Sequence, residues 1–158
     1  MARAVFLADA DFAWTLENSD KWLPGVVEAA LRAGAAILAA EMKRNLRGEI
    51  ADPQAVELIG SFGITPVGQD SRRDWNVHLG FDGYQQPGTG KWKGTGVPFQ
   101  MIARVFESGS VKDGYQWRQP THFARRAVQA KRAAAEAEMK RIAEERMQEI
   151  LRTGKGHD

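Results

Sequence analysis

The sequence contains no cysteine among its 158 residues and only three histidines. The absence of cysteine excludes disulfides, a thiol nucleophile and every zinc or iron–sulfur site built on thiolates. The three histidines, His78, His122 and His157, are far apart in the sequence, which leaves little for a metal centre made of protein side chains. We therefore expect no metal and no other cofactor.

The chain also lacks an excess of either charge and a long apolar run. Its 22 Lys and Arg balance 20 Asp and Glu to a net charge of +2, which does not indicate a nucleic-acid specialist. The longest apolar or glycine run, residues 33–40, falls far short of the roughly twenty residues that span a bilayer. An apolar start interrupted by Asp9 and Asp11 is too short for a secretory signal. We expect no membrane partner and synthesis in the cytoplasm.

Two long helical patterns account for much of what is present. The first covers residues 24–48, with Pro24 in its first turn and Gly48 at its end. The second runs from His122 to about Arg152, with Thr121 as the expected cap. At roughly 45 Å it is longer than a compact domain of this size, so part of it should project or lie on a neighbour. The expected buried face of the first helix is Val27, Leu31, Gly34, Leu38 and Met42.

Shorter elements lie between these helices. Short helices are predicted at residues 53–59 and 98–107, and strands at residues 4–8, 62–67, 74–81 and 115–118. The strand at 74–81 alternates, so Trp75, Val77, Leu79 and Phe81 should share one buried face. The predicted fold class is α+β, in which a small antiparallel sheet packs against a long helix from the N-terminal half and a long C-terminal helix. Residues 1–158 should form a single domain.

A glycine-rich segment at residues 82–97 has no periodicity and predicts a long flexible loop over residues 83–96. Its glycine spacing fits neither the P-loop nor the dinucleotide-binding fingerprint. Lys91 and Lys93 flank Trp92, a type of tip that can stack on a base or touch phosphates, and Arg72-Arg73 lies nearby in sequence. An exposed loop whose tryptophan covers a neighbouring surface is the favoured interpretation. Residues 153–158 should form a frayed tail.

Catalytic residues are not evident in the sequence. His78 and Asp74 lie on the same face of the predicted strand, but about 13 Å apart, which is too far for a hydrogen bond. Ser108 and Ser110 flank Gly109 without forming a nucleophile elbow. We expect a protein that is not an enzyme and has no catalytic residues.

The second half of the chain carries two short motifs. The first is a segment of the form A-x-x-x-E-x-G-[TS], formed by Ala103, Glu107, Gly109 and Ser110. The second places a proline shortly before F-x-x-x-A and is formed by Pro120, Phe123 and Ala127 at the start of a long helix. In this order the segments resemble the minor tail-component, or neck, proteins of lambda-like long-tailed phages. The resemblance covers roughly residues 24–152. The sequence departs from the family in its longer loop at 82–97, in Ser110 where threonine is more usual, and in the distance of Pro120 from Phe123.

The resemblance implies a structural protein of the virion, made in the host bacterial cytoplasm, that forms a ring at the head–tail junction. Its implied partners are further copies of itself, six by family resemblance, head-closure or connector proteins, and tail-tube or terminator proteins. DNA would pass through the ring without sequence-specific contact. The candidate partner-binding residues are Lys91, Trp92, Lys93, Glu107, Tyr115 and Trp117.

Two other functions remain open at this point. The first is a tail-terminator ring that caps the tail tube, which belongs to the same class but another position. The second is a small DNA-binding module that uses Lys91, Trp92, Lys93 and Arg72-Arg73. A steep salt dependence of DNA binding would favour the module, and a ring in electron micrographs would favour the neck or terminator protein.

Overall fold

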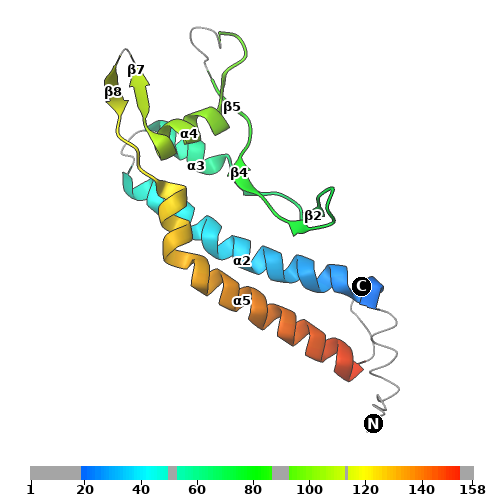
Figure 1. Cartoon of the computed structure of the whole chain (residues 1–158). Helices are drawn as coiled ribbons and strands as arrows, with labels where there is room; N and C mark the ends of the chain where they lie inside the picture. Colours follow the sequence, from blue (N-terminus) through cyan, green and yellow to red (C-terminus); the bar gives the residue numbers. More distant parts are fainter. Residues whose placement is uncertain (1–18, 50–52, 87–92, 113, 154–158) are drawn as a thin grey trace, which may run out of the picture.

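The computed structural model describes residues 19–49, 53–86, 93–112 and 114–153. Within these residues the fold is α+β, as predicted: four helices combine with four small two-stranded antiparallel ladders. Figure 1 shows two long helices side by side, with the ladders and the short helices gathered at one end of the pair. The strand predicted at residues 4–8, and the tail beyond Thr153, lie outside the described residues.

The two long helices are α2 (Ser19–Glu49) and α5 (Phe123–Thr153), of 31 residues each. They run antiparallel along much of their length (Figure 1). Helix α2 begins five residues before the predicted start, so Pro24 lies inside the helix rather than in its first turn. This proline removes only the hydrogen bond to the carbonyl of residue 20, close to the helix end, which explains why the helix continues through it.

The buried face of α2 differs from the predicted one because this helix has two partners. Gly34 and Met42 are buried as predicted, whereas Val27, Leu31 and Leu38 are only partly buried. One side packs on α5 and another on the core formed by the shorter elements, so the burial pattern shifts along the helix. The buried apolar side chains are Val26, Ala30, Ala35, Ala39, Met42 and Leu46.

The start of α5 is capped differently from the prediction. Thr121 does not cap the helix, because its hydroxyl donates to the carbonyl of Phe106 at 2.9 Å. The carboxylate of Glu107 caps it instead, accepting hydrogen bonds from the backbone N–H of Ala124 at 2.8 Å and of Arg125 at 3.2 Å. A side chain from another helix thus satisfies two of the N–H groups that a helix start leaves unpaired.

The predicted strand at 74–81 is two short strands. Strand β4 (Leu79–Phe81) pairs with β1 (Phe62–Ile64), and β3 (Trp75–Asn76) pairs with β2 (Gly68–Gln69). The ladder is interrupted between them because the Thr65 hydroxyl accepts the N–H of His78 at 2.9 Å, which replaces a backbone acceptor. The result is one irregular hairpin, where a single continuous strand in a sheet was expected.

Two more hairpins flank a short helix. Strand β5 (Tyr84–Gln85) pairs with β6 (Val97–Pro98), and β7 (Ser110–Lys112) pairs with β8 (Tyr115–Arg118). Helix α4 (Phe99–Ser108) lies between β6 and β7, and α3 (Pro53–Gly60) precedes β1. The predictions of both short helices and of a strand at 115–118 are confirmed. The predicted loop at 83–96 is shorter than expected at its start, because residues 84–85 form a strand, and residues 87–92 lie outside the described part.

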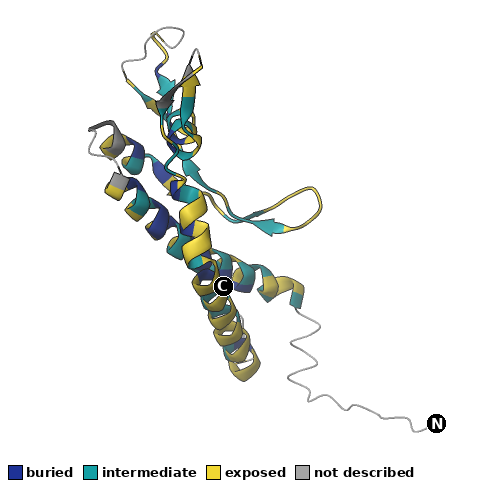
Figure 2. Ribbon diagram, turned by 60° about the vertical axis from the view of Figure 1, so that its left-hand side comes forward, coloured by how far each residue is buried: buried dark blue, intermediate teal, exposed yellow. Residues whose placement is uncertain are grey.

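The core lies at the end of the molecule where all four helices meet (Figure 2). Leu79 and Phe81 pack against it as predicted, whereas Trp75 and Val77 are half-buried and do not belong to it. The interruption at residues 77–78 separates β3 from the core (Figure 1). The buried members of the core are Ala39, Met42, Leu46, Leu58, Phe62, Phe99, Ala103, Phe106, Phe123 and Ala127.

Helix α2 is long and apolar enough, by length and composition, to cross a membrane. Its mean hydropathy over the most apolar window reaches 1.5, with 28% of that window buried within the chain. The apolar run at residues 33–40 understates this helix, because counting uninterrupted apolar residues misses a helix interrupted by single charged residues. The core helix of a soluble protein passes the same criteria, and α2 packs on both α5 and the core.

Candidate partner-binding surface

Helix α4 is the base from which two hairpins project. The β5–β6 hairpin enters this helix at Phe99, and the β7–β8 hairpin leaves it after Gly109. Figure 1 shows both hairpins extending from the same end of the molecule, away from the α2–α5 pair. At 10 residues, α4 is about 15 Å long, so the bases of the hairpins are separated by roughly that distance.

Three of the six predicted partner-binding residues, Lys93, Tyr115 and Trp117, lie on or beside these hairpins within the described part of the chain. Lys93 is exposed in the turn that leads into β6, whereas Lys91 and Trp92 lie outside the described residues. Tyr115 and Trp117 are in β8, where their backbone is described and their side chains are not. The structure therefore brings Lys93 and strand β8, which are more than twenty positions apart in sequence, to one end of the molecule.

Trp117 occupies a β-bulge. Arg118 pairs with Ser110 and Gln116 pairs with Val111, so β8 has one extra residue, Trp117, against its partner strand. A bulge bends its strand and increases the local twist, and bulges are common where a side chain is redirected for binding. The sequence contains no turn or glycine signal at this position, which explains why the bulge was not foreseen.

Glu107 makes defined contacts inside the chain. Its carboxylate bonds two backbone N–H groups of α5, and the backbone N–H of His122 donates to the Glu107 carbonyl at 3.1 Å. These bonds join the end of α4 to the start of α5. The role that the structure gives Glu107 is to hold this junction together.

The other residues of the two sequence motifs meet at the same junction. Ala103 in α4, and Phe123 and Ala127 in α5, are all buried in the core. Gly109 has a φ of 73°, and a Cβ added to it would lie 2.6 Å from the carbonyl oxygen of Arg118. Only glycine fits such a position without strain. The motifs that carry the family resemblance are therefore the residues that build the α4–α5 junction.

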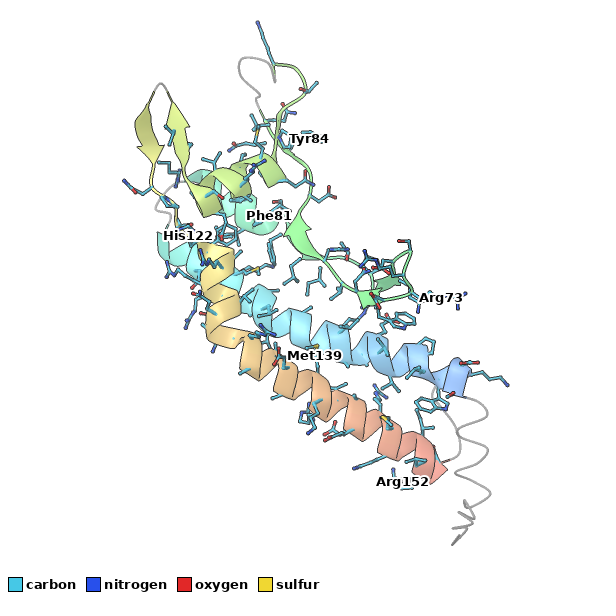
Figure 3. The ribbon with its side chains drawn as sticks, in the orientation of Figure 1. Arg73, Phe81, Tyr84, His122, Met139 and Arg152 are labelled. Atoms are coloured by element: carbon cyan, nitrogen blue, oxygen red, sulfur yellow. The ribbon has the colours of Figure 1, made fainter. Side chains whose placement is uncertain are left out.

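A shallow groove of about 490 Å³ runs beside the β1–β4 ladder and the first turn of α4. His78 and Asp82 line it, but the Asp82 carboxylate accepts the neighbouring N–H of Gly83 at 2.8 Å. Figure 3 shows Phe81 beside this region and Tyr84 further along the chain. Within the described ranges, no group of three or more histidine, aspartate or glutamate side chains is placed to hold a metal ion.

Charged pairs cover the second half of α5. Arg141 lies between Glu138 and Glu145, and the hydrogen bonds that its guanidinium donates to both carboxylates raise its pKa. The hydrogen bond from Arg141 lowers the pKa of Glu138. Arg132 and Glu136 form a further pair at 2.7 Å. All of these side chains are solvent-exposed or half-buried, so they form a solvated helix face.

The chain matches no family model, no curated protein and no solved structure. Its function is therefore argued from the residues and their arrangement.

Proposed function

We propose that this protein is a structural subunit of a ring at the head–tail junction of a long-tailed phage. In this role it binds further copies of itself, six in a ring by family resemblance, together with a head-closure or connector protein and a tail-tube or terminator protein. DNA passes through the ring, and the protein resides in the neck of the virion after synthesis in the bacterial cytoplasm. In this proposal the protein acts by binding its neighbours in a fixed arrangement, and it needs no catalysis, cofactor or membrane.

The observation that carries this proposal is the pair of hairpins projecting from α4. Each is a two-stranded ladder, and an isolated two-stranded hairpin is marginally stable in water. Each strand is paired on one side only within the described residues, so its other edge can accept a strand from a partner. Two such edges at one end of a subunit suit contact with two different neighbouring proteins.

The open shape of the helix pair supports the same proposal. Of the 31 residues of α5, only Phe123, Ala127, Ala135 and Ile150 are buried. Leu23 of α2 and Met147 and Leu151 of α5 are between 42% and 44% exposed. Exposed apolar side chains at one end of a helix pair suit a heterologous contact, in which one patch meets a different patch on the next copy.

The α4–α5 junction supports the family resemblance itself. Its motif residues have defined structural roles. Ala103, Phe123 and Ala127 are buried, Glu107 caps α5, and Gly109 has a positive φ. A motif with this basis argues for a shared fold with the neck proteins, and it leaves the surface residues free to differ between relatives. The role therefore rests on the projecting hairpins more than on the motifs.

Complementation of a phage that lacks this chain tests the role. In lysates that contain filled heads and separate tails, added wild-type protein should restore joining, measured as plaque-forming particles. A variant in which a short Gly-Ser linker replaces residues 86–95 should keep its melting temperature but fail to restore joining. A matched control with substitutions in the exposed charged face of α5, Lys140→Gln and Arg146→Gln, should join heads to tails normally.

Electron microscopy of the joined particles tests the ring. Labelled protein should lie at the head–tail junction with rotational symmetry higher than two-fold. Label on free tails before joining would favour the terminator position instead. A monomeric or two-fold arrangement in the virion, or wild-type protein that does not restore joining, would show that the proposal is wrong.

A further inference from the structure

Positive charge is concentrated in the first half of α5. Between Pro120 and Ala135 the sequence holds four basic residues and no acidic residue. Between residues 136 and 149 it holds five acidic and three basic residues. The ion pairs that the structure describes along α5 all lie between Arg132 and Glu149. The two halves of this helix therefore differ in charge as well as in packing.

The fold brings a second basic segment to the same place. The side-chain amide of Asn45 in α2 donates to the carbonyl of Phe123 at 3.0 Å, so the last turns of α2 lie against the first turn of α5. Arg44 and Arg47 are within two residues of Asn45, and Arg125 and Arg126 are within three of Phe123. All four are exposed. Figure 3 shows His122 marking this end of α5, opposite Arg152. We call these four arginines the basic end.

The acidic side chains beside the basic end are directed inward or occupied. Glu41 is only 6% exposed and pairs with Arg44, whose own side chain is 74% exposed. Glu107 bonds the backbone N–H groups at the start of α5. Glu136, the next acidic residue along α5, pairs with Arg132. Even with Glu49 at the end of α2 counted beside Glu41 and Glu107, the Lys and Arg of residues 41–49 and 120–132 outnumber the acidic residues, so the basic end has a net positive charge.

Arg125 and Arg126 occupy a position that is unfavourable for cations, although the Arg126 guanidinium also donates to the carbonyl of Thr121 at 3.4 Å. These side chains lie in the first turn of α5, which contains no acidic residue. The N-terminal end of a helix carries partial positive charge, so cations there are unfavourable, whereas Arg47 at the end of α2 suits its helix dipole. Two arginines held at an unfavourable position on an exposed surface suggest a negatively charged partner.

We infer that the basic end is a contact surface for the phosphate backbone of double-stranded DNA. Several arginines drawn from two adjacent helices match a repeating polyanion better than a single phosphate, since duplex DNA carries a charge about every 1.7 Å along its axis. The duplex is favoured over single strands because the one aromatic residue in residues 41–48 and 123–132, Phe123, is buried and offers no ring for base stacking.

This inference rests on the proposed function for its choice of anion, because a ring at the head–tail junction surrounds passing DNA. It assigns the DNA-facing surface to the junction of α2 and α5, whereas the sequence suggested the loop at Lys91 and Lys93. Contacts of this kind bind without sequence preference, and they weaken steeply as salt rises.

A salt titration with a 30-base-pair duplex tests the inference on the whole chain. The variant Arg47→Gln/Arg125→Gln/Arg126→Gln removes three cations and leaves the Arg44–Glu41 pair intact. The matched control, Lys140→Gln/Arg146→Gln/Arg152→Gln, removes the same charge from the other half of α5. In the basic-end variant, the slope of log K against log salt should become less negative by about 2.7, which corresponds to the loss of roughly three phosphate contacts. Its affinity at about 50 mM salt should fall at least tenfold. The control should stay within about threefold of wild type.

Three outcomes would overturn the inference. These are equal losses of affinity in both variants, no duplex binding by the wild type at about 50 mM salt, or binding to phosphatidylserine vesicles with the same arginine dependence and no binding to DNA.

Sedimentation in the same buffers distinguishes a failure of the DNA inference from a failure of the proposed ring. If rings form but the basic-end variant keeps full DNA affinity, the inference about the basic end is wrong and the proposed ring is not affected. DNA binding through the basic end without ring formation in the virion would refute the neck role and favour a small DNA-binding module.

Discussion

The two ends of the α2–α5 pair are built in different ways. At one end, which we call the core end, large apolar side chains from all four helices and from β1 and β4 pack together, with the rings of Phe62 and Phe81 meeting edge to face at 4.9 Å. At the other end, the arm (residues 19–33 and 136–153), two helices meet almost alone. Where the arm meets the core end, Gly34 lies so close to Met139 that a Cβ added to Gly34 would be 2.6 Å from the Met139 Cγ.

This difference indicates where stability resides. Burying large side chains contributes several kcal/mol each, whereas a contact between small residues contributes mainly through close backbone approach. The core end should therefore hold most of the free energy of unfolding. The arm should be the part that depends on neighbours, which agrees with its exposed Leu23, Met147 and Leu151.

The largest expected effect is at the core end. Phe106→Ala removes a ring that is 2% exposed and lies at the centre of the core, so the free energy of unfolding should fall by about 3–5 kcal/mol. Chemical denaturation followed by circular dichroism measures this. Met101→Ala, on the exposed side of the same helix, should cost less than about 1 kcal/mol. Similar losses in the two variants would contradict the placement of the core.

A smaller effect, with a diagnostic sign, is expected where the arm meets the core end. Gly34→Ala should destabilise the chain by about 1–2 kcal/mol, because the new methyl group collides with Met139. In a Met139→Ala background the same change should stabilise by up to about 1 kcal/mol, since alanine is the better helix former and the obstacle is gone. A double-mutant cycle, in which the free energies of unfolding of the single and double variants are compared, measures this change of sign. The same sign in both backgrounds would refute the close approach of α2 and α5.

Removal of the Glu107 cap at the start of α5 should have a moderate to small effect on the free energy of unfolding. Glu107→Ala leaves two N–H groups of α5 without their acceptor, and should lower the free energy of unfolding by about 0.5–2 kcal/mol. Glu144→Ala, which removes an exposed carboxylate of the arm, should change it by less than about 0.5 kcal/mol. A Glu107 variant as stable as wild type, but defective in assembly, would assign this residue to partner binding.

The smallest effect concerns pH. The bond from Arg141 lowers the pKa of Glu138 from 4.5, so the stability that this carboxylate contributes is present above pH 4.5 and is lost as the pH falls through the lowered pKa. Melting temperatures of wild type and Glu138→Gln should differ slightly at pH 7 and converge in strong acid. Because the pair is exposed, about 0.5 M salt should shrink the difference. A difference that grows in acid would contradict this assignment.

Periodicity in the sequence predicted the helices well and the sheet poorly. The repeats of α2, α4 and α5 extend over several turns, so local pattern was sufficient to place them. The single strand predicted at 74–81 failed because a side chain, the Thr65 hydroxyl, replaces a backbone acceptor, and no local pattern encodes that contact. The predicted cap of α5 was wrong for the same reason. Thr121 has a residue type that caps helices, but the carboxylate of Glu107, fourteen positions earlier, accepts the N–H groups at the start of α5.

The candidate surface was only partly predictable for a related reason. Aromatic and basic residues in a glycine-rich segment suggested binding at Lys91, Trp92 and Lys93, but only the fold brings β8 and its bulge to the same end of the molecule. The basic end required a contact between residues 45 and 123, which are 78 positions apart. Its one sequence signal is the absence of acidic residues between Pro120 and Ala135.

Native-state hydrogen exchange on the isolated chain tests most directly the claim that stability resides at the core end. The account predicts that amides in residues 42–46, 99–107 and 124–130 exchange only through global unfolding, whereas those in residues 23–33 and 136–150 exchange through openings of lower free energy. Assembly into the ring should slow exchange in the arm and leave the core end unchanged. Equal protection of the arm and the core end in the isolated chain would contradict the account, because the arm would then need no neighbour.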